Sequence, residues 1–267
     1  MNNTSSRVLL LLLALALSPI TGWSQAAAGS GAAKPAADQS AGVKTRDGNV
    51  ERINALLAQV KTAMDTKNWK DTLSPLQELM ALDPGGWRYY QMLGTAQLNL
   101  RHYGDADRAF ETGIGLAQKV VATAAPSDLR NPDSEAARAK AGLGMMWTNQ
   151  GNCYLKQRKN SEAIAAYQKA AELSPNPGIA YFNICAVLYN MGDLVGTRPA
   201  CAKAIAVDPQ KADAYFILGS VLYIDGNFVG NKYVTSAEAL QALKKYLELA
   251  PNGPHAADVK AMLDMAK

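Results

Sequence analysis

Residues 144–177, GMMWTNQGNCYLKQRKNSEAIAAYQKAAELSPNP, decide the fold. Their apolar residues recur every three to four positions, which is the spacing of amphipathic helices, and this spacing continues from Val50 to the end of the chain. Breaks rich in Gly, Asn, Asp or Pro interrupt it about every 15 to 20 residues. No stretch alternates between apolar and polar residues for long enough to predict a strand. The sequence therefore predicts an all-α protein.

The breaks between the helices also repeat along the chain. Four of them have similar sequences that end in proline: ALDP at Pro84, ELSP at Pro175, AVDP at Pro209 and ELAP at Pro251. The second and third of these prolines are 34 residues apart. That length is typical of a unit of two antiparallel helices, which buries its apolar faces only by stacking on neighbouring units.

Residues of set size at fixed places in each unit make the sequence resemble the tetratricopeptide-repeat family. We place the starts of the units at Ile53, Trp87, Gly144, Gly178 and Ala212. The eighth residues of these units are then Val60, Gly94, Gly151, Cys185 and Gly219. Large residues stand at the fourth and twenty-fourth positions, as in Tyr90 with Phe110, Trp147 with Tyr167 and Tyr215 with Leu243. The resemblance implies a right-handed α-solenoid of about five helix pairs, with units near 53–86, 87–120, 144–177, 178–211 and 212–253, closed by a capping helix at 254–267.

Two insertions interrupt the period of the repeat. Residues 121–143 are expected to lengthen one helix, turn, and start the next helix early, because Asn131–Glu135 combines capping residues, a proline and early acids. The second insertion, near 226–235, contains glycine pairs that favour turns, and Phe228 and Tyr233 are expected to pack it down. A functional loop and a passive insertion both remain open for each.

The first residues have the layout of a secretory signal peptide. Arg7 is the only charge before an apolar run at 8–17, and a small-residue cleavage site follows at Ser24–Ala26. The apolar run is too short to cross a hydrocarbon core as a helix. An uncleaved membrane anchor is the alternative. We expect a signal peptide at 1–26, a flexible linker rich in Ala, Gly and Ser at 27–49, and a tetratricopeptide domain at 50–267. The mature protein is expected to be periplasmic or secreted and to have no membrane span after cleavage.

The sequence offers little for catalysis. Beyond the signal peptide it has only His102 and His255, neither in a metal-ligand spacing, and it has no phosphate-binding glycine loop. A thiol–imidazole pair of Cys153 and His102 would join residues of different units, so a buried apolar role is the better interpretation of Cys153. We expect no enzyme activity, no cofactor and no metal. The net charge of +4 is too small to indicate a nucleic-acid partner.

The resemblance places a binding groove on the concave surface. In the family, the second, fifth, ninth, twelfth and thirteenth residues of each unit's first helix line this surface. The expected peptide-binding residues are Asn152, Phe182, Asn183, Tyr189, Phe216 and Tyr223. Their rings would take apolar side chains, and their amides would pair with a peptide backbone. The alternative is that the aromatic residues only fill space between neighbouring helices.

One binding mode of the family is not expected here. Members that clamp a carboxy-terminal carboxylate use two Asn flanked by Lys and Arg. Asn152 and Asn183 match the two Asn, but Thr148, Asp213 and Ile217 stand at the cationic positions. Without cations, the carboxylate would gain no charge-assisted pairing.

Cys185 and Cys201 stand at the eighth and twenty-fourth positions of the fourth unit, on helices that the resemblance places face to face. A disulfide between them is expected to be within geometric reach, and an oxidising compartment would permit it. Pro199 is expected to delay or bend the start of the second helix, so this unit would benefit from a bridge. Two reduced cysteines acting as small apolar residues are the alternative. If the bridge forms, Cys153 stays free.

These observations lead to one leading function and two alternatives. The leading interpretation is an exported adaptor that binds a protein or peptide partner in its concave groove. The second is a structural scaffold of the cell envelope that self-associates into a homo-oligomer. An enzyme is a remote third. The sequence names neither the partner nor the pathway.

The signal peptide gives the first testable prediction. When the protein is produced in a host that exports it, amino-terminal sequencing should return a mature chain that begins near Ala27, because small residues precede this position. A processed protein that still begins at Met1 would contradict the interpretation.

Overall fold

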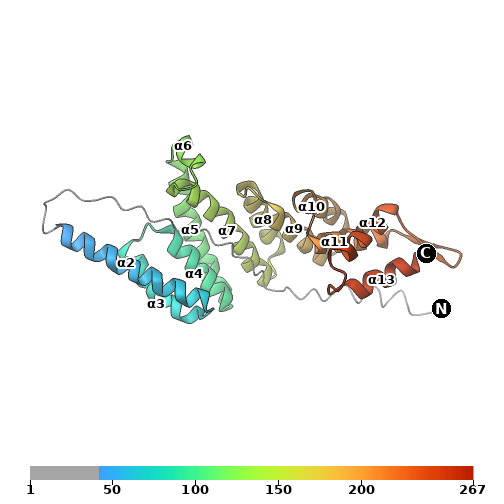
Figure 1. The fold of residues 1–267 in the computed structure, drawn as a ribbon, viewed down its shortest axis with the longest axis horizontal. Coiled ribbons are helices and arrows are strands. Elements are labelled where there is room, and N and C mark those ends of the chain that lie inside the picture. Colours follow the sequence, from blue (N-terminus) through green and yellow to red (C-terminus); the bar gives the residue numbers. More distant parts are fainter. Residues whose placement is uncertain (1–41, 267) are drawn as a thin grey trace. The chain divides into compact units, whose positions relative to one another are not determined.

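Antiparallel pairs of α-helices follow one another along the chain in the computed structural model (Figure 1). The structure describes residues 42–266, with side chains from Asn49 on. We number the pairs as units 1 to 5 and call their helices A and B. The pairs are α2 (Gly42–Asp65) with α3 (Leu73–Leu82), α4 (Trp87–Asn99) with α5 (Tyr103–Ala122), α7 (Glu135–Lys156) with α8 (Asn160–Leu173), α9 (Gly178–Met191) with α10 (Leu194–Val207), and α11 (Ala212–Ile224) with α12 (Ala237–Leu249).

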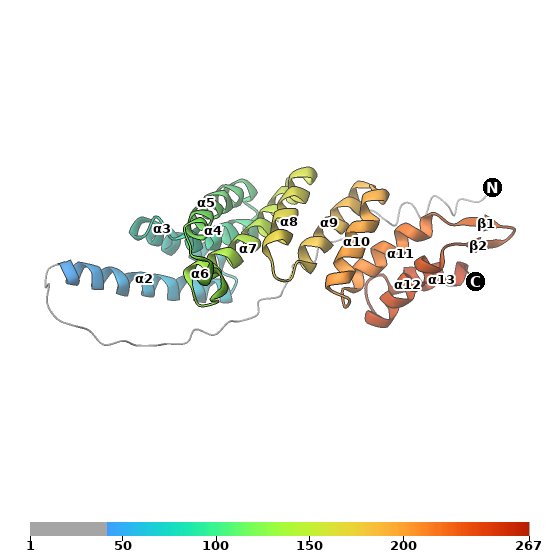
Figure 2. The ribbon, with the colours of Figure 1, turned by 90° about the horizontal axis from the view of Figure 1, so that it is seen from above.

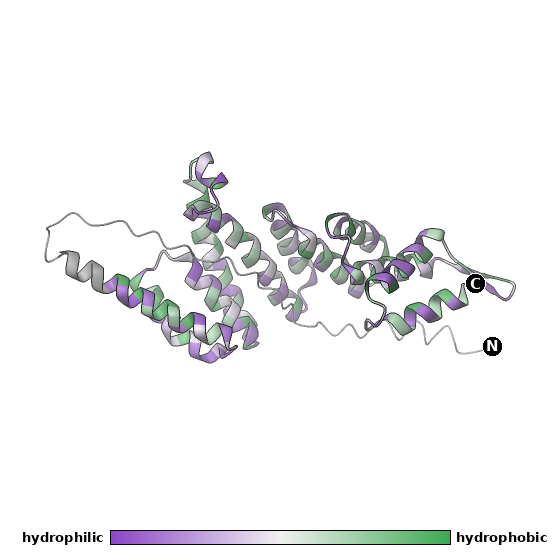
Figure 3. Ribbon diagram, in the orientation of Figure 1, coloured by the Kyte–Doolittle hydropathy of each residue, from purple (hydrophilic) through white to green (hydrophobic). Residues whose placement is uncertain are grey.

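Each helix packs on its neighbours in the chain. The B helix of one unit packs on the A helix of the next, as α8 does on α9 and α10 on α11, and successive A helices also touch, as α9 and α11 do. Hydrophobic and hydrophilic residues alternate around the helices, so each has an apolar side to bury (Figure 3). The predicted all-α repeat fold is confirmed.

A close approach joins the two helices of each unit. The eighth residue of helix A meets the twenty-fourth position of helix B, and in three units glycine meets a large side chain: Gly94 with Phe110, Gly151 with Tyr167 and Gly219 with Leu243. A β-carbon on Gly151 would lie 2.6 Å from the Tyr167 ring, so any larger residue would push the helices apart. The Phe110 and Leu243 side chains are fully buried at these contacts.

The first insertion extends two helices beyond the length of their counterparts. α5 continues to Ala122, the short helix α6 (Pro126–Arg130) follows, and α7 begins at Glu135, which places α6 at the projecting tip in Figure 1. The Ser134 hydroxyl accepts a hydrogen bond from the Ala137 N–H and caps α7. This helix start is the one that the sequence predicted.

The extended part of α7 ties unit 3 to unit 2. The Glu135 carboxylate accepts a hydrogen bond of 2.7 Å from the Trp87 indole and also pairs with Arg88. Further along, Gly142 lies so close to Trp87 that a β-carbon would come within 2.2 Å of the ring. The insertion therefore contributes to the core between these units.

The second insertion contains a β-hairpin, which the sequence did not predict. β1 (Asn227–Val229) pairs antiparallel with β2 (Lys232–Val234), and Phe228 lies opposite Tyr233. The turn begins at Gly230, whose φ of 62° suits glycine at the first central position of a two-residue turn. Three residues per strand are too few to show an alternating pattern, which is why the strands escaped prediction.

The two ends of the folded region complete it. α13 (Ala256–Met265) packs on α12 and buries Ala256 and Val259. At the other end α2 begins at Gly42, within the segment 27–49 that the sequence predicted as a linker. A helix already packed at Leu56 extends upstream easily, because each added residue adds one backbone hydrogen bond. The predicted signal peptide and the rest of the linker lie outside the described residues.

Among residues 42–266, no helix combines the length and the apolar character that a membrane crossing requires.

The close approach within each unit leads to a prediction. Gly151→Ala should destabilise the protein by about 1–3 kcal/mol, because the added methyl group overlaps a buried ring. Gly115→Ala is the matched control, since no atom lies within 4 Å of that β-carbon and the helix should gain about 0.5–1 kcal/mol. Thermal unfolding followed by circular dichroism measures both. Equal melting temperatures for the two variants would contradict the role of the contact.

Candidate peptide-binding face

The predicted groove residues all lie on the A helices of units 3 to 5. We call the surface formed by the groove-lining positions of α4, α7, α9 and α11 the A-helix face. Asn152 lies on α7, Phe182, Asn183 and Tyr189 on α9, and Phe216 and Tyr223 on α11. Their surroundings differ, and the differences decide which of them a partner can reach.

The two asparagines are held at the border between core and surface. The Tyr167 hydroxyl donates a hydrogen bond of 2.7 Å to the Asn152 side-chain oxygen, which fixes the amide with its NH₂ group turned away from the ring. The Asn183 Nδ2 is buried and has no hydrogen-bond partner among the described residues. The Asn152 NH₂ group therefore has donor capacity that a bound backbone carbonyl would satisfy, whereas the Asn183 Nδ2 would first have to become accessible.

Phe182 is half-buried and carries a charge over its ring. The Lys211 ammonium lies 4.3 Å from the ring centroid, within the range of a cation–π interaction. Lys211 immediately precedes α11, so this contact connects units 4 and 5.

Tyr189 is 7% exposed, and its hydroxyl has no hydrogen-bond partner among residues 42–266. Burial raises the pKa of this hydroxyl to about 12. Ser220 on the adjacent α11 is likewise buried, and its Oγ also lacks a partner in the same part of the chain. Both hydroxyls are thus buried without the hydrogen bond that buried polar atoms normally make.

Phe216 and Tyr223 are covered, which corrects the expectation that they face an open groove. Phe216 is 6% exposed and stacks on the His255 ring with 3.8 Å between centroids. The Tyr223 hydroxyl donates a hydrogen bond of 3.0 Å to the backbone carbonyl of Met262 on α13. Among residues 42–266, α13 and the residues before it follow unit 5, and they bury the two rings.

Two apolar residues of the A-helix face are exposed and were missed. Met145 and Ile179, the second residues of units 3 and 4, are 48% and 53% exposed. The Gln91 amide lies 3.6 Å from the Met145 sulfur, so Met145 borders the A helix of unit 2. The sequence could have indicated these two residues, because the second position of a unit is one of those that line the concave surface in the family. The residues predicted for the groove are aromatic residues and asparagines, and they include no aliphatic side chain.

A shallow depression of about 610 Å³ lies elsewhere, between α10, α11 and α12. Ile205, Tyr215, Leu218 and Lys245 contribute to its lining, and none of the predicted groove residues does. Lys245 pairs with Glu248 at its margin.

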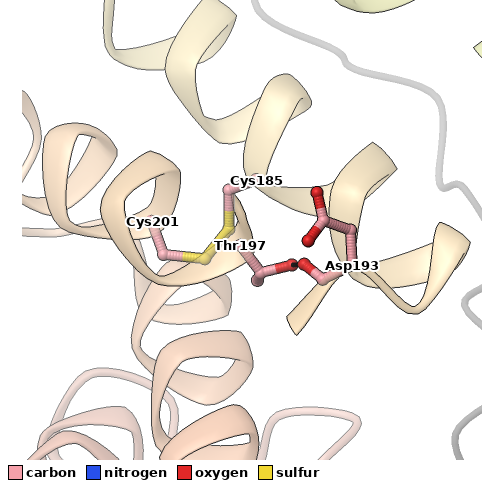
Figure 4. The surroundings of a disulfide bond; sticks show 4 residues. All are labelled: Cys185, Asp193, Thr197 and Cys201. Carbon is pink, nitrogen blue, oxygen red and sulfur yellow. Dashed lines mark hydrogen bonds between the residues drawn. A yellow bond between two sulfur atoms is a disulfide. The ribbon is translucent and has the colours of Figure 1, made fainter. Parts of the chain in front are cut away.

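Cys185 and Cys201 are joined by a disulfide across unit 4 (Figure 4). Their α-carbons are 4.9 Å apart, and both residues are fully buried. α10 begins at Leu194 and continues through Pro199, so the expected delay of this helix is wrong. The Asp193 carboxylate caps the first turn by accepting from the Gly196 N–H, which stabilises the start.

The remaining cysteine is not placed for catalysis. Cys153 is fully buried, and burial raises the pKa of its thiol to about 12. His102 is exposed and hydrogen bonds to Gln97, so the structure does not bring this histidine to the thiol. Across residues 42–266, no group of three or more His, Cys, Asp or Glu side chains could hold a metal ion.

Comparison with known families agrees with this geometry. Residues 145–177 match the tetratricopeptide repeat. The match covers the third unit, and the stacked helix pairs repeat the same architecture along the chain, so the fold is that of a tetratricopeptide-repeat solenoid. No curated protein matches the sequence.

Several solved structures share the fold. The crystal structure of MamA has a TM-score of 0.56 and 17% identity, covering 78% of this chain and 95% of its own. YrrB, described as a TPR protein with an unusual peptide-binding site, has a TM-score of 0.56 and 21% identity, covering 83% and 98%. PilF of Pseudomonas aeruginosa has a TM-score of 0.56 and 15% identity, covering 82% and 89%. At these identities the likeness concerns the fold alone.

The bridge in unit 4 leads to a prediction. Thiol counting on the denatured, unreduced mature protein should find one free thiol, that of Cys153, and three would contradict the bridge. Replacing both Cys185 and Cys201 by Ala should lower the free energy of unfolding by about 3 kcal/mol, since the bridge closes a loop of about 16 residues in the unfolded chain. Cys153→Ala is the control and should leave the count of bridged cysteines unchanged.

Proposed function

We propose that the mature chain is an exported, non-catalytic adaptor that binds an extended segment of a partner polypeptide on the A-helix face of units 3 and 4. The observation that carries this proposal is the combination of exposed Met145 and Ile179 with the Asn152 and Asn183 amides on the same helices. Export rests on the signal-like sequence at 1–26.

The chemistry of this surface suits a peptide in extended conformation. Exposed apolar side chains on consecutive A helices give a peptide two places to bury its own apolar side chains. Further along the same helices, the Asn152 amide offers a donor to a peptide carbonyl, and such a hydrogen bond does not depend on the peptide's sequence. The family's cationic clamp positions hold Thr148, Asp213 and Ile217, so we propose an internal segment as the ligand.

Known relatives in fold support an interaction role. YrrB is a tetratricopeptide-repeat protein with a peptide-binding site. We extend peptide binding from that protein to this chain on the strength of the surface described above, not of the 21% identity.

The proposal is tested with peptides selected against the mature protein from a random displayed library. Ile179→Asp should weaken the binding of a selected peptide by more than about tenfold, because it places a charge where an apolar side chain is buried. Val50→Asp is the matched control, since Val50 is as exposed as Ile179 and lies on α2, outside the A-helix face. Fluorescence anisotropy measures both affinities. An Ile179→Asp variant that binds as tightly as the control would move the site away from this face.

A further inference from the structure

Exposed apolar side chains gather where helix A gives way to helix B in units 4 and 5. We call them the apolar edge: Met191, Val195, Ile224, Phe228, Val229 and Val234, which are 37–83% exposed. The other large exposed apolar residues of the described chain are scattered over α2, α7, α9, α10 and α13. Isolated exposed apolar residues are ordinary, but a gathered set marks an interaction surface.

The hairpin that carries half of this edge is held firmly at its base. The Tyr233 hydroxyl donates a hydrogen bond of 2.6 Å to the Tyr223 carbonyl, and the two rings stack with 4.6 Å between centroids. Arg198 of α10 pairs with Asp225 where the hairpin begins, which connects the edges of units 4 and 5 and neutralises both charges. Beyond this base the strands extend away from the helices in both views (Figures 1 and 2).

The outer side of β1 has the features of a strand that pairs further. Within residues 42–266 the hairpin is a two-stranded sheet, and such hairpins are marginally stable alone. Proteins usually protect an exposed edge strand by keeping it very short or by placing charges or proline on it. β1 is short, but it reads Asn-Phe-Val and has neither a charge nor a proline, whereas β2 carries Lys232.

We propose that the apolar edge binds a second copy of this chain, with β1 pairing antiparallel to β1 of the copy. A strand that pairs antiparallel with its own copy is self-complementary, because one two-fold axis generates both halves. With the axis at Phe228, the two Phe228 rings face each other, and Asn227 lies opposite Val229 of the copy. The result is a four-stranded sheet with β2 on its outer sides.

Charge favours the second copy over a lipid surface. Lys232 lies on the outer strands of the four-stranded sheet, away from the axis, so the pairing brings no like charges together. A peripheral membrane site normally combines apolar residues with a basic cluster, and Lys232 is the only basic residue in 226–236. The strand pairing alone is small, so the interface also needs the helical members of the edge and should form a reversible dimer.

This inference is independent of the A-helix face, since no residue of the apolar edge belongs to the proposed peptide site. Sedimentation equilibrium of the mature full-length chain should show a monomer–dimer equilibrium that depends on concentration. Phe228→Lys should raise the dissociation constant by more than about tenfold, because it places two like charges opposite each other. The side chain is 63% exposed, so the fold should be retained, which circular dichroism checks. Val207→Lys is the control and should dimerise like the parent protein.

The register has its own test. Under mild oxidation, Phe228→Cys should form a covalent dimer, because directly opposite residues of an antiparallel pair lie about 5 Å apart at their β-carbons. Lys232→Cys, equally exposed but on the outer strand, should not. A parent protein that stays monomeric, or a dimer unaffected by Phe228→Lys, overturns the proposal. Binding to anionic phospholipid vesicles that Phe228→Lys abolishes, without dimerisation, would assign the edge to a membrane instead.

Discussion

The close contact between the eighth residue of helix A and the twenty-fourth of helix B is the constraint on which the other packing depends. Where glycine stands on helix A, the partner side chain lies directly against the backbone, as Tyr167 does on Gly151. This contact sets the distance between the helices, and the distance in turn sets how the next unit can stack. In unit 1, Val60 and Leu76 meet the same requirement with two aliphatic side chains.

Unit 4 meets the requirement by a covalent bond. Cys185 and Cys201 occupy the places that glycine and a large residue hold elsewhere, and two small residues would leave space between the helices. The disulfide fills that space and fixes the separation at 4.9 Å between α-carbons. It does so in the unit whose B helix contains Pro199, where the backbone lacks one hydrogen bond.

The repeat made much of the fold predictable. The positions assigned to the starts of units 2, 4 and 5 are Trp87, Gly178 and Ala212, where α4, α9 and α11 begin. Such starts are visible in the sequence because they depend on local capping and on a period of residue sizes. The facing cysteines could be recognised for the same reason, since their positions in the unit place them opposite each other.

The accessibility of the site could not be predicted in this way. Phe182 and Phe216 hold equivalent positions in their units, yet Lys211 covers one ring and His255 stacks on the other. A position in a repeat determines which way a side chain points, but what covers it comes from the next element along the chain. For unit 5 that element is the irregular cap, to which no period applies. The hairpin escaped prediction for a related reason, because its strands are short and its stability depends on Tyr233 contacting Tyr223.

The same logic separates the two interaction surfaces of the molecule. In a stacked array the apolar sides of the A and B helices are buried by neighbouring helices, and exposed apolar residues of units 3 to 5 are found where this stacking does not reach. On the A-helix face, the exposed apolar residues are the second residues of units 3 and 4. At the connections between helices A and B, they belong to the loop of unit 4 and the hairpin of unit 5. A dimer formed through the hairpins would leave both A-helix faces unobstructed by the pairing strands. Two peptide sites in one particle increase the apparent affinity for a partner that presents the segment repeatedly, without any new contact. The proposed self-association and the proposed peptide binding would then be complementary rather than competing.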